Sequence, residues 1–259
     1  MKELGKRVLT AIIGIPVAIF VILQGGLFFT LSIMIIIAFG LLEFYKMAEN
    51  KGFKPLTIPS IALSLLATIL IYFTLTKQLA NISFVYTFLT PTLIGTLILL
   101  LALFKKDISS ITDISITIAG TIYVAFPLVC LIAIREFNYV SVPEIQWGYF
   151  VLIMFITIWV CDSAAYFIGK SIGKHKLFPR HSPKKSWEGA IAGFIFGTAG
   201  FVGLTYYFNP ALSFTNSLII GVVITVFSQF GDLIESHFKR DAEVKDSSNF
   251  FPGHGGFLD

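Results

Sequence analysis

The chain has 259 residues, of which 56% are hydrophobic and only 13% are charged, and its mean hydropathy is +0.84. A soluble globular domain carries roughly 25% charged residues, so this composition excludes an ordinary soluble domain and indicates an integral membrane protein. The net charge is +4. The two cysteines, Cys130 and Cys161, fall in apolar segments and predict neither a disulfide framework nor a zinc site.

Apolar segments long enough to cross a bilayer recur along the chain. A membrane-spanning helix needs about 20 mostly apolar residues, whereas barrel strands are shorter and alternate, so the sequence predicts an all-α, polytopic transmembrane helical bundle. Eight spans are predicted, at about 8–23, 28–48, 57–75, 84–104, 112–134, 148–169, 189–208 and 213–235. We expect one membrane domain over residues 1–259, with its active-site half at about 148–259.

The basic residues predict the orientation of these spans. If the N-terminus is cytoplasmic, eight crossings place 17 of the 19 Lys and Arg residues on the cytoplasmic side and leave only Lys77 and Arg135 outside. Cytoplasmic loops carry the excess of basic residues in membrane proteins. The sequence therefore predicts a multi-pass protein of the cell (inner) membrane, with the N-terminus and the loops 170–188 and 236–259 in the cytoplasm.

Two predicted spans carry a carboxylate near their cytoplasmic ends. Asp162 lies about two turns and Asp232 about one turn before the end of its helix. A carboxylate at this depth is costly and normally faces a polar cavity or a cation, although either residue alone could also reach the interface or pair with a lysine. Polar residues at three- and four-residue spacing surround Asp232 and favour a functional face: Ser228, Gln229, Glu235 and Ser236.

The loop 170–188 has a composition that suits phosphate binding. It holds six Lys and Arg residues and a single acid, Glu188. Cations and hydroxyls suit polyphosphate oxygens, and glycines let the backbone approach them. A basic inner loop can also serve only to set the orientation in the membrane. The candidate substrate-binding residues here are Lys170, Lys174, Ser182, Lys184, Lys185 and Ser186. Neither GxxxxGK[ST] nor GxGxxG is present.

The loop 236–259 combines cations with carboxylates. Phosphoryl or nucleotidyl transfer needs cations to stabilise the phosphates and carboxylates to hold a divalent metal. The loop contains both kinds: Lys239, Arg240, Lys245, Asp241, Glu243, Asp246 and Asp259. Mg²⁺ prefers one or two carboxylates plus water and substrate phosphates, so Asp246 with an intramembrane aspartate would suffice. His254, in PGHGG, is a candidate catalytic residue or a hydrogen-bonding residue of the loop.

Twelve positions of this loop resemble the signature of the bacterial phosphatidate cytidylyltransferases, or CDP-diacylglycerol synthases. They are Ser236, Lys239, Arg240, Lys245, Asp246, Ser248, Phe251, Pro252, His254, Gly255, Gly256 and Asp259. The stretches CDSAAYFIGKSIGKHKLFPRHSPKKSWEG and RVLTAIIGIP are similar to two further regions of that family. The family signature continues with an arginine, an aspartate and a last hydrophobic helix, so we expect a ninth helix beyond Asp259.

The resemblance implies a reaction of CTP with phosphatidate that gives CDP-diacylglycerol and pyrophosphate, with Mg²⁺ as cofactor. The phosphate of phosphatidate is already largely ionised, so no strong general base is needed. The implied catalytic residues are Asp246, Lys245, Lys239, Arg240 and His254; Gly255 and Gly256 would join the substrate-binding set, and Asp246, Asp232 and Asp162 would hold the metal. The expected partners are CTP, phosphatidate and membrane lipid, with no nucleic acid; a homo-oligomer stays open.

Two other functions remain open at this point. A CTP-dependent lipid kinase of the dolichol-kinase kind would use similar loops but would transfer the γ-phosphoryl group and release CDP. An ion-coupled transporter with Asp162 and Asp232 as its ion site is the weaker alternative. Transporters have broken helices near the middle of the membrane, whereas the polar residues here crowd the inner leaflet.

Overall fold

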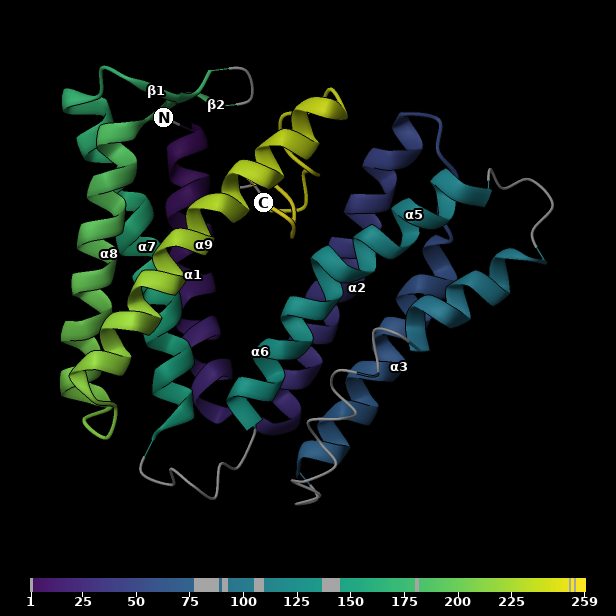
Figure 1. Cartoon of the computed structure of the whole chain (residues 1–259), viewed down its shortest axis with the longest axis horizontal. Coiled ribbons are helices and arrows are strands. Elements are labelled where there is room, and N and C mark those ends of the chain that lie inside the picture. Colours follow the sequence, from purple (N-terminus) through teal and green to yellow (C-terminus); the bar gives the residue numbers. More distant parts are fainter. Residues whose placement is uncertain are drawn as a thin grey trace. The chain divides into compact units, whose positions relative to one another are not determined.

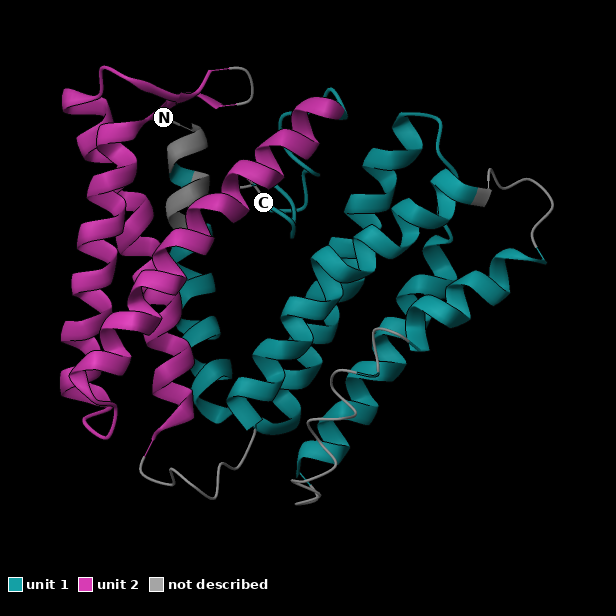
Figure 2. Cartoon of the chain, in the orientation of Figure 1, with its two compact units in different colours: residues 1–139, 242–259 teal, residues 140–241 magenta. Residues whose placement is uncertain are grey.

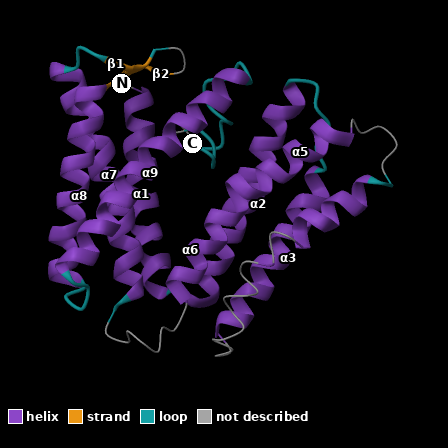
Figure 3. Cartoon of the chain, in the orientation of Figure 1, coloured by secondary structure: helices purple, strands orange, loops and turns teal. Residues whose placement is uncertain are grey.

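A computed structural model gives the structure of the chain and describes residues 2–76, 89, 93–104, 110–136, 145–179, 182–251, 253 and 255–259. Nearly every described segment is helical, and the described strands form one short hairpin (Figure 1, Figure 3). The predicted all-α helical fold is confirmed. The helices are α1 (Lys2–Gln24), α2 (Gly26–Asn50), α3 (Thr57–Thr76), α5 (Ser110–Gly120), α6 (Phe126–Glu136), α7 (Trp147–Ile172), α8 (Trp187–Phe208) and α9 (Phe214–Asp241), with a π-helical turn, η1 (Thr121–Ala125), between α5 and α6.

Six described helical stretches are long and apolar enough to cross a membrane, by length and composition. They are α2, α3, the continuous stretch Ile111–Glu136, α7, α8 and α9. Two shorter apolar helices are Thr10–Gln24 and Leu93–Ala102. Six of the eight predicted spans are thus confirmed. The two shorter helices lie at the predicted spans 8–23 and 84–104, and part of the latter lies outside the described residues. The chain is therefore a polytopic membrane protein.

The chain forms two compact units, which are described separately (Figure 2). Unit 1 comprises Met1–Tyr139 and Ala242–Asp259, and unit 2 comprises Val140–Asp241. The predicted active-site half thus contains residues of both units. That residues 1–259 fold as a single domain stays a prediction.

A buried polar network fixes the helices of unit 1. The Tyr45 side chain on α2 is fully buried, and its hydroxyl lies 2.6 Å from Ser60 Oγ on α3 and donates to the Thr117 carbonyl of α5 at 2.7 Å. Ser60 Oγ also lies 2.8 Å from Thr121 Oγ1 in η1. Lipid offers no hydrogen bonds, so polar groups inside a membrane protein must find partners within the protein. This network therefore sets how α2, α3 and α5 pack.

At one end of unit 1, two charged residues of α6 stabilise the turn between α1 and α2. The Arg135 guanidinium donates to the carbonyls of Ile22 at 2.7 Å and Leu23 at 2.9 Å, at the end of α1. The Gly26 backbone N–H, at the start of α2, donates to Glu136 Oε1 at 2.7 Å. A cation at a helix C-terminus and a carboxylate at a helix N-terminus both complement the helix dipole. The end of α6 is thereby joined to the α1–α2 turn.

In unit 2, glycines let α7 and α8 approach closely. Gly189, Gly193 and Gly197 recur every fourth residue on the face of α8 that meets α7. A Cβ at Gly193 would lie 2.8 Å from the Cys161 carbonyl oxygen and 3.1 Å from Ala165 Cβ. Small residues at this spacing are typical of closely packed membrane helices.

Two polar contacts complete unit 2. Thr198 Oγ1 on α8 lies 3.1 Å from Thr225 Oγ1 on α9. At the far end from the hairpin, the fully buried Asn209 accepts from the Gln146 backbone N–H at 2.8 Å and donates to the Gln146 carbonyl at 3.2 Å. The threonine contact joins α8 to α9, and the two hydrogen bonds of Asn209 join the start of α7 to the end of α8.

A hairpin connects α7 to α8. Strands β1 (Lys176–Phe178) and β2 (Ser182–Ser186) pair antiparallel, with Lys176 opposite Ser186 and Phe178 opposite Ser182. The sequence analysis treated this segment as a loop and did not predict strands. The segment is short and polar, and the sequence SPKKS has no apolar alternation that would indicate a strand.

Candidate functional site

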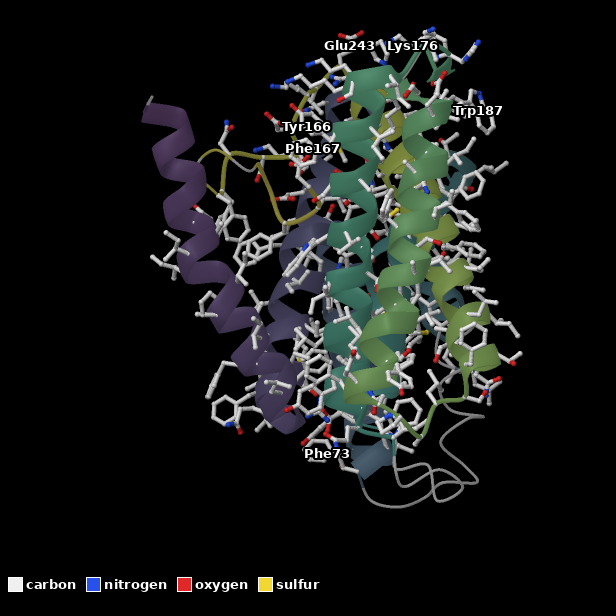
Figure 4. All side chains as sticks on the ribbon, turned by 90° about the vertical axis from the view of Figure 1, so that its left-hand side faces the viewer. Phe73, Tyr166, Phe167, Lys176, Trp187 and Glu243 are labelled. Atoms are coloured by element: carbon white, nitrogen blue, oxygen red, sulfur yellow. The ribbon has the colours of Figure 1, made fainter. Side chains whose placement is uncertain are left out.

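A cavity of about 700 Å³ lies in unit 2 at the hairpin end of its helices. Its lining comes from α7, the hairpin, the start of α8 and α9. Small-molecule sites typically occupy roughly 300–1,000 Å³, so the cavity could hold a nucleotide. In Figure 4, Lys176 labels the hairpin end of this unit, and Trp187 marks the start of α8.

One face of α7 forms a wall of the cavity. Its lining residues, Asp162, Ala165, Tyr166, Gly169, Lys170 and Gly173, recur at three- and four-residue spacing and therefore share a side of the helix. Lys170 Nζ lies 5.7 Å from the centre of the Tyr166 ring. This face thus carries a carboxylate, Asp162, and a cation, Lys170, that lies about two turns closer to the end of the helix.

The hairpin brings more cations to the same cavity. Lys176, Lys184 and Lys185 all line it, and Lys185 forms an ion pair with Asp232 of α9. The Lys185 side chain is 30% exposed and that of Asp232 is 49% exposed. Ion pairs this open to solvent contribute under about 1 kcal/mol, so Lys185 can exchange the carboxylate for a phosphate oxygen at small cost.

Helix α9 contributes Gln229 and Asp232, one turn apart. The Gln229 side-chain amide donates to the Ala190 carbonyl at 3.2 Å, which ties α9 to the first turns of α8. The Ser236 hydroxyl donates to Asp232 Oδ1 at 3.4 Å. Asp232 and Asp162 therefore reach one cavity from two different helices.

Ser186 and the glycines around it shape the floor of the cavity. The Ser186 hydroxyl caps α8 by accepting from the Gly189 N–H at 3.2 Å. A Cβ at Gly173 would collide with both the Gly169 carbonyl oxygen and Ser186 Oγ, and one at Gly189 would lie 2.6 Å from the Ala165 carbonyl oxygen. Glycine is required here because the hairpin, α7 and α8 approach so closely.

The structure brings together most, but not all, of the predicted site residues of unit 2. Asp162, Lys170, Lys184, Lys185, Ser186 and Asp232 line the cavity. Among the described lining residues, Lys174 and Ser182 are absent, although both belong to the segment that carries the hairpin. Lys239 pairs with Glu235 Oε1 at 2.8 Å within the last turns of α9, beside Arg240.

The remaining predicted residues lie in the C-terminal loop (residues 242–259) of unit 1. Lys245 and Asp246 are exposed there, and Asp246 forms no ion pair with any residue of the described part of the chain. A Cβ at Gly255 would lie 2.9 Å from Asp259 Cγ. His254 lies outside the described residues. The proposed roles of these residues stay predictions.

Comparison with known proteins gives the family. A sequence model of the Cytidylyltransferase family matches residues 5–259. The chain belongs to the cytidylyltransferase family. It is similar to the phosphatidate cytidylyltransferases of Synechocystis sp., with 33% identity over 98% of this chain and 90% of the relative, and of Bacillus subtilis, with 31% identity over 100% and 93%. A protein of the same name from Haemophilus influenzae is 45% identical over 43% of this chain and 41% of the relative. The resemblance drawn from the C-terminal loop is confirmed.

The cavity offers a divalent cation only a small number of protein ligands. Among the described residues, no group of three or more His, Cys, Asp and Glu side chains lies close enough to enclose a metal. Mg²⁺ needs no such cage, because it binds one or two carboxylates and completes its shell with water and substrate phosphates. Asp162 and Asp232 offer two carboxylates in one cavity. Asp246 belongs to unit 1, and its part in metal binding stays a prediction.

Three residues were not among the predicted site residues. Lys176 and Gln229 line the cavity, although the sequence indicated the first only as one of the six cations of the loop 170–188 and the second only as part of the polar face around Asp232. Glu43 on α2 is 7% exposed and binds the C-terminal loop. Glu43 could have been found from the sequence, because it is a carboxylate inside the apolar span 28–48 and a buried carboxylate needs partners.

Proposed function

We propose that this protein transfers the cytidylyl group of CTP to phosphatidate and releases pyrophosphate. The observation that carries the proposal is the cavity of unit 2, in which four lysines and two aspartates meet. Four cations suit a triphosphate, and the names of the relatives give the acceptor as phosphatidate. The product would be CDP-diacylglycerol.

The chemistry requires positioning and charge stabilisation above all. A phosphate oxygen of phosphatidate attacks the α-phosphorus of CTP, the bond to the β-phosphate oxygen breaks, and pyrophosphate leaves with its electron pair. Lys170, Lys184 and Lys185 would bind the oxygens on which negative charge grows. No residue has to remove a proton from the attacking phosphate.

Mg²⁺ is proposed as the cofactor, with Asp162 and Asp232 as its ligands in unit 2 and Asp246 as the third candidate. When bound, it would neutralise phosphate charge and orient the triphosphate. Asp232 can serve in this way because its carboxylate is half-exposed and, among the described residues, contacts Lys185 and Ser236.

We propose further that the protein lies in the cell (inner) membrane, with the cavity and the C-terminal loop on the cytoplasmic side. Two contacts within unit 1 support the predicted alternation. Gly26 contacts Glu136, and both are predicted outside. The Lys54 N–H donates to Asp113 Oδ1 at 2.9 Å, and both lie at predicted inner ends.

The test is an assay of the full chain, purified in detergent, with CTP radiolabelled on either the α- or the γ-phosphate. With phosphatidate and Mg²⁺, α-label should enter a chloroform-soluble lipid and γ-label should appear in pyrophosphate. Chelation of the metal with EDTA should abolish both. Entry of γ-label into the lipid with release of CDP would instead identify a lipid kinase, and consumption of CTP without phosphatidate would contradict the proposed acceptor.

A further inference from the structure

Glu43, on α2, binds the C-terminal loop with both oxygens of its carboxylate. Oε1 accepts from the Ser248 hydroxyl at 2.6 Å and from the Phe257 N–H at 3.0 Å. Oε2 accepts from the Ser247 hydroxyl at 2.8 Å and from the Leu258 N–H at 2.8 Å. Glu43 is 7% exposed, so these groups, and not water, surround its carboxylate.

The chemistry of the four partners suits a carboxylate and no other side chain. An ionised carboxylate has about four acceptor positions and no donor, and here three donors and the Ser247 hydroxyl face them. The single hydrogen of Ser247 is shared with Asp259 Oδ2, which lies 2.7 Å from the same hydroxyl. Glutamine has the same shape, but its NH₂ group would turn two N–H donors toward these partners. A serine hydroxyl could rotate to accept, whereas the backbone N–H of Phe257 or Leu258 could not.

Gly256 permits this approach. A Cβ at position 256 would collide with Ser247 Oγ and with both carboxylate oxygens of Glu43. The sequence analysis assigned this glycine to a close approach by substrate. In the structure the group that approaches it is the protein's own carboxylate, so the glycine and Glu43 form one arrangement.

Two more features hold the loop in the same place. Phe39, one turn before Glu43 on α2, stacks on Phe257 with 4.9 Å between ring centres and lies 5.4 Å from the Phe250 ring. Within the loop, Asp259 Oδ2 accepts from the Gly256 N–H at 2.8 Å and from the Ser247 N–H at 2.7 Å. The loop is thus folded on itself and fixed to one face of α2.

We propose that Glu43 is a positioning residue for cytidylyl transfer: it holds the C-terminal loop in the conformation that presents Lys245 and Asp246. Ser247 follows Asp246 directly, so the hydrogen bonds of Glu43 begin one residue after the proposed metal ligand. Reacting groups displaced by about 1 Å can lose about a hundredfold in rate, so a loop with this task needs such an anchor. The inference rests on the proposed function for its catalytic part only.

The test compares Glu43→Gln, Ser248→Ala and their combination with Glu49→Gln, an exposed glutamate on the same helix. Hydrogen exchange followed by mass spectrometry measures the amides of Phe257 and Leu258 in the intact protein. In Glu43→Gln these amides should exchange about tenfold faster or more, because charge-assisted hydrogen bonds are lost. Glu49→Gln should exchange like the parent.

Steady-state kinetics then tests the catalytic part. Glu43→Gln should lower kcat by about tenfold or more, with a smaller change in the KM for CTP, because the loop is displaced in the transition state. Ser248→Ala should have a milder effect, and the double variant should be no worse than Glu43→Gln, since both changes remove one shared contact.

Each outcome decides one part of the inference. Unchanged exchange of the Phe257 and Leu258 amides in both Glu43→Gln and Ser248→Ala would overturn the anchor. Faster exchange with a kcat equal to that of Glu49→Gln would overturn the positioning role. A parent protein that makes no CDP-diacylglycerol would refute the proposed function, while the exchange measurement would still test the anchor. If Glu43→Gln fails to fold, Ser248→Ala carries both measurements.

Discussion

Lys185 shows how one residue can serve both the resting and the substrate-bound protein. Its ion pair with Asp232 balances one positive and one negative charge at the cavity. When a triphosphate enters, the lysine gains a stronger partner, because charge-assisted hydrogen bonds to phosphate are short and directional. In the proposed function, Asp232 would then be available to bind a cation.

We expect Lys184→Gln and Lys185→Gln each to reduce kcat/KM for CTP by about tenfold or more, since loss of one charge-assisted bond to phosphate costs roughly 1.5–3 kcal/mol. Lys46→Gln, an exposed change on α2, is the matched control and should stay close to the parent. Initial rates at varied CTP measure the effect. Parent-like values in both cavity variants would exclude the cavity as the triphosphate site.

Asp246→Asn is expected to insert and fold normally while turnover falls by about a hundredfold or more, because a metal ligand loses its charge and each 1.36 kcal/mol is about tenfold in rate. The sequence also allowed a mere ion pair with Lys245 or Lys239, worth under about 1 kcal/mol, but no such pair occurs among the described residues, so the competing explanation is a solvated Asp246 without a catalytic role. Turnover of the purified variant at saturating Mg²⁺ decides between them. A fall of less than about fivefold would move the metal site elsewhere.

The sequence predicted the cavity residues better than it predicted Glu43. Asp162, Asp232 and Lys185 carry charge next to apolar spans, where a charge alone indicates function. Glu43 carries the same signal, but its partners lie 204 to 215 residues away and two of them are backbone N–H groups, which no side-chain pattern reveals. Lys174 was predicted to bind substrate but does not line the cavity, and the hairpin that follows it was not indicated by the sequence either.

Among the elements, the pair α7 and α8 depends most on small residues. We expect Gly193→Ala to lower the free energy of unfolding by about 1–3 kcal/mol, because its methyl group would press on the Cys161 carbonyl, and backbone cannot move aside as a side chain can. Gly203→Ala, on the same helix with no heavy atom within 4 Å of the new Cβ, should leave stability unchanged or raise it. Thermal unfolding in detergent compares the two. Equal melting temperatures would mean that the close approach of the helices is not needed.

The spans were predictable because lipid leaves a chain few choices. A run of about 20 apolar residues must become a helix to satisfy its backbone, and α2, α3, α7, α8 and α9 follow the predicted ranges closely. The extension of α9 to Asp241, beyond the predicted end at 235, is polar and was not indicated by hydropathy. The β1–β2 hairpin belongs to none of the candidate spans, so the same constraint does not act on it.

For the whole molecule, orientation in the membrane is the property to test. A cysteine at Lys174 should resist an impermeant thiol reagent in intact cells and react after lysis, whereas one at Ala211, exposed between α8 and α9, should react at once. The parent protein controls for the buried Cys161 and half-buried Cys130. Reaction at position 174 before lysis would reverse the proposed topology.

The bonds of Glu43 also set an order of events during synthesis. Unit 1 is discontinuous, and Ser247 follows Glu43 by 204 residues. At roughly 5–20 residues per second, a ribosome needs about 10–40 s to reach Ser247 after Glu43 has been made. Throughout that interval the glutamate sits in an inserted helix without the hydroxyls and amides that later surround it. A nascent chain that stalls before Ser247 therefore carries Glu43 without the groups that surround it in the finished protein.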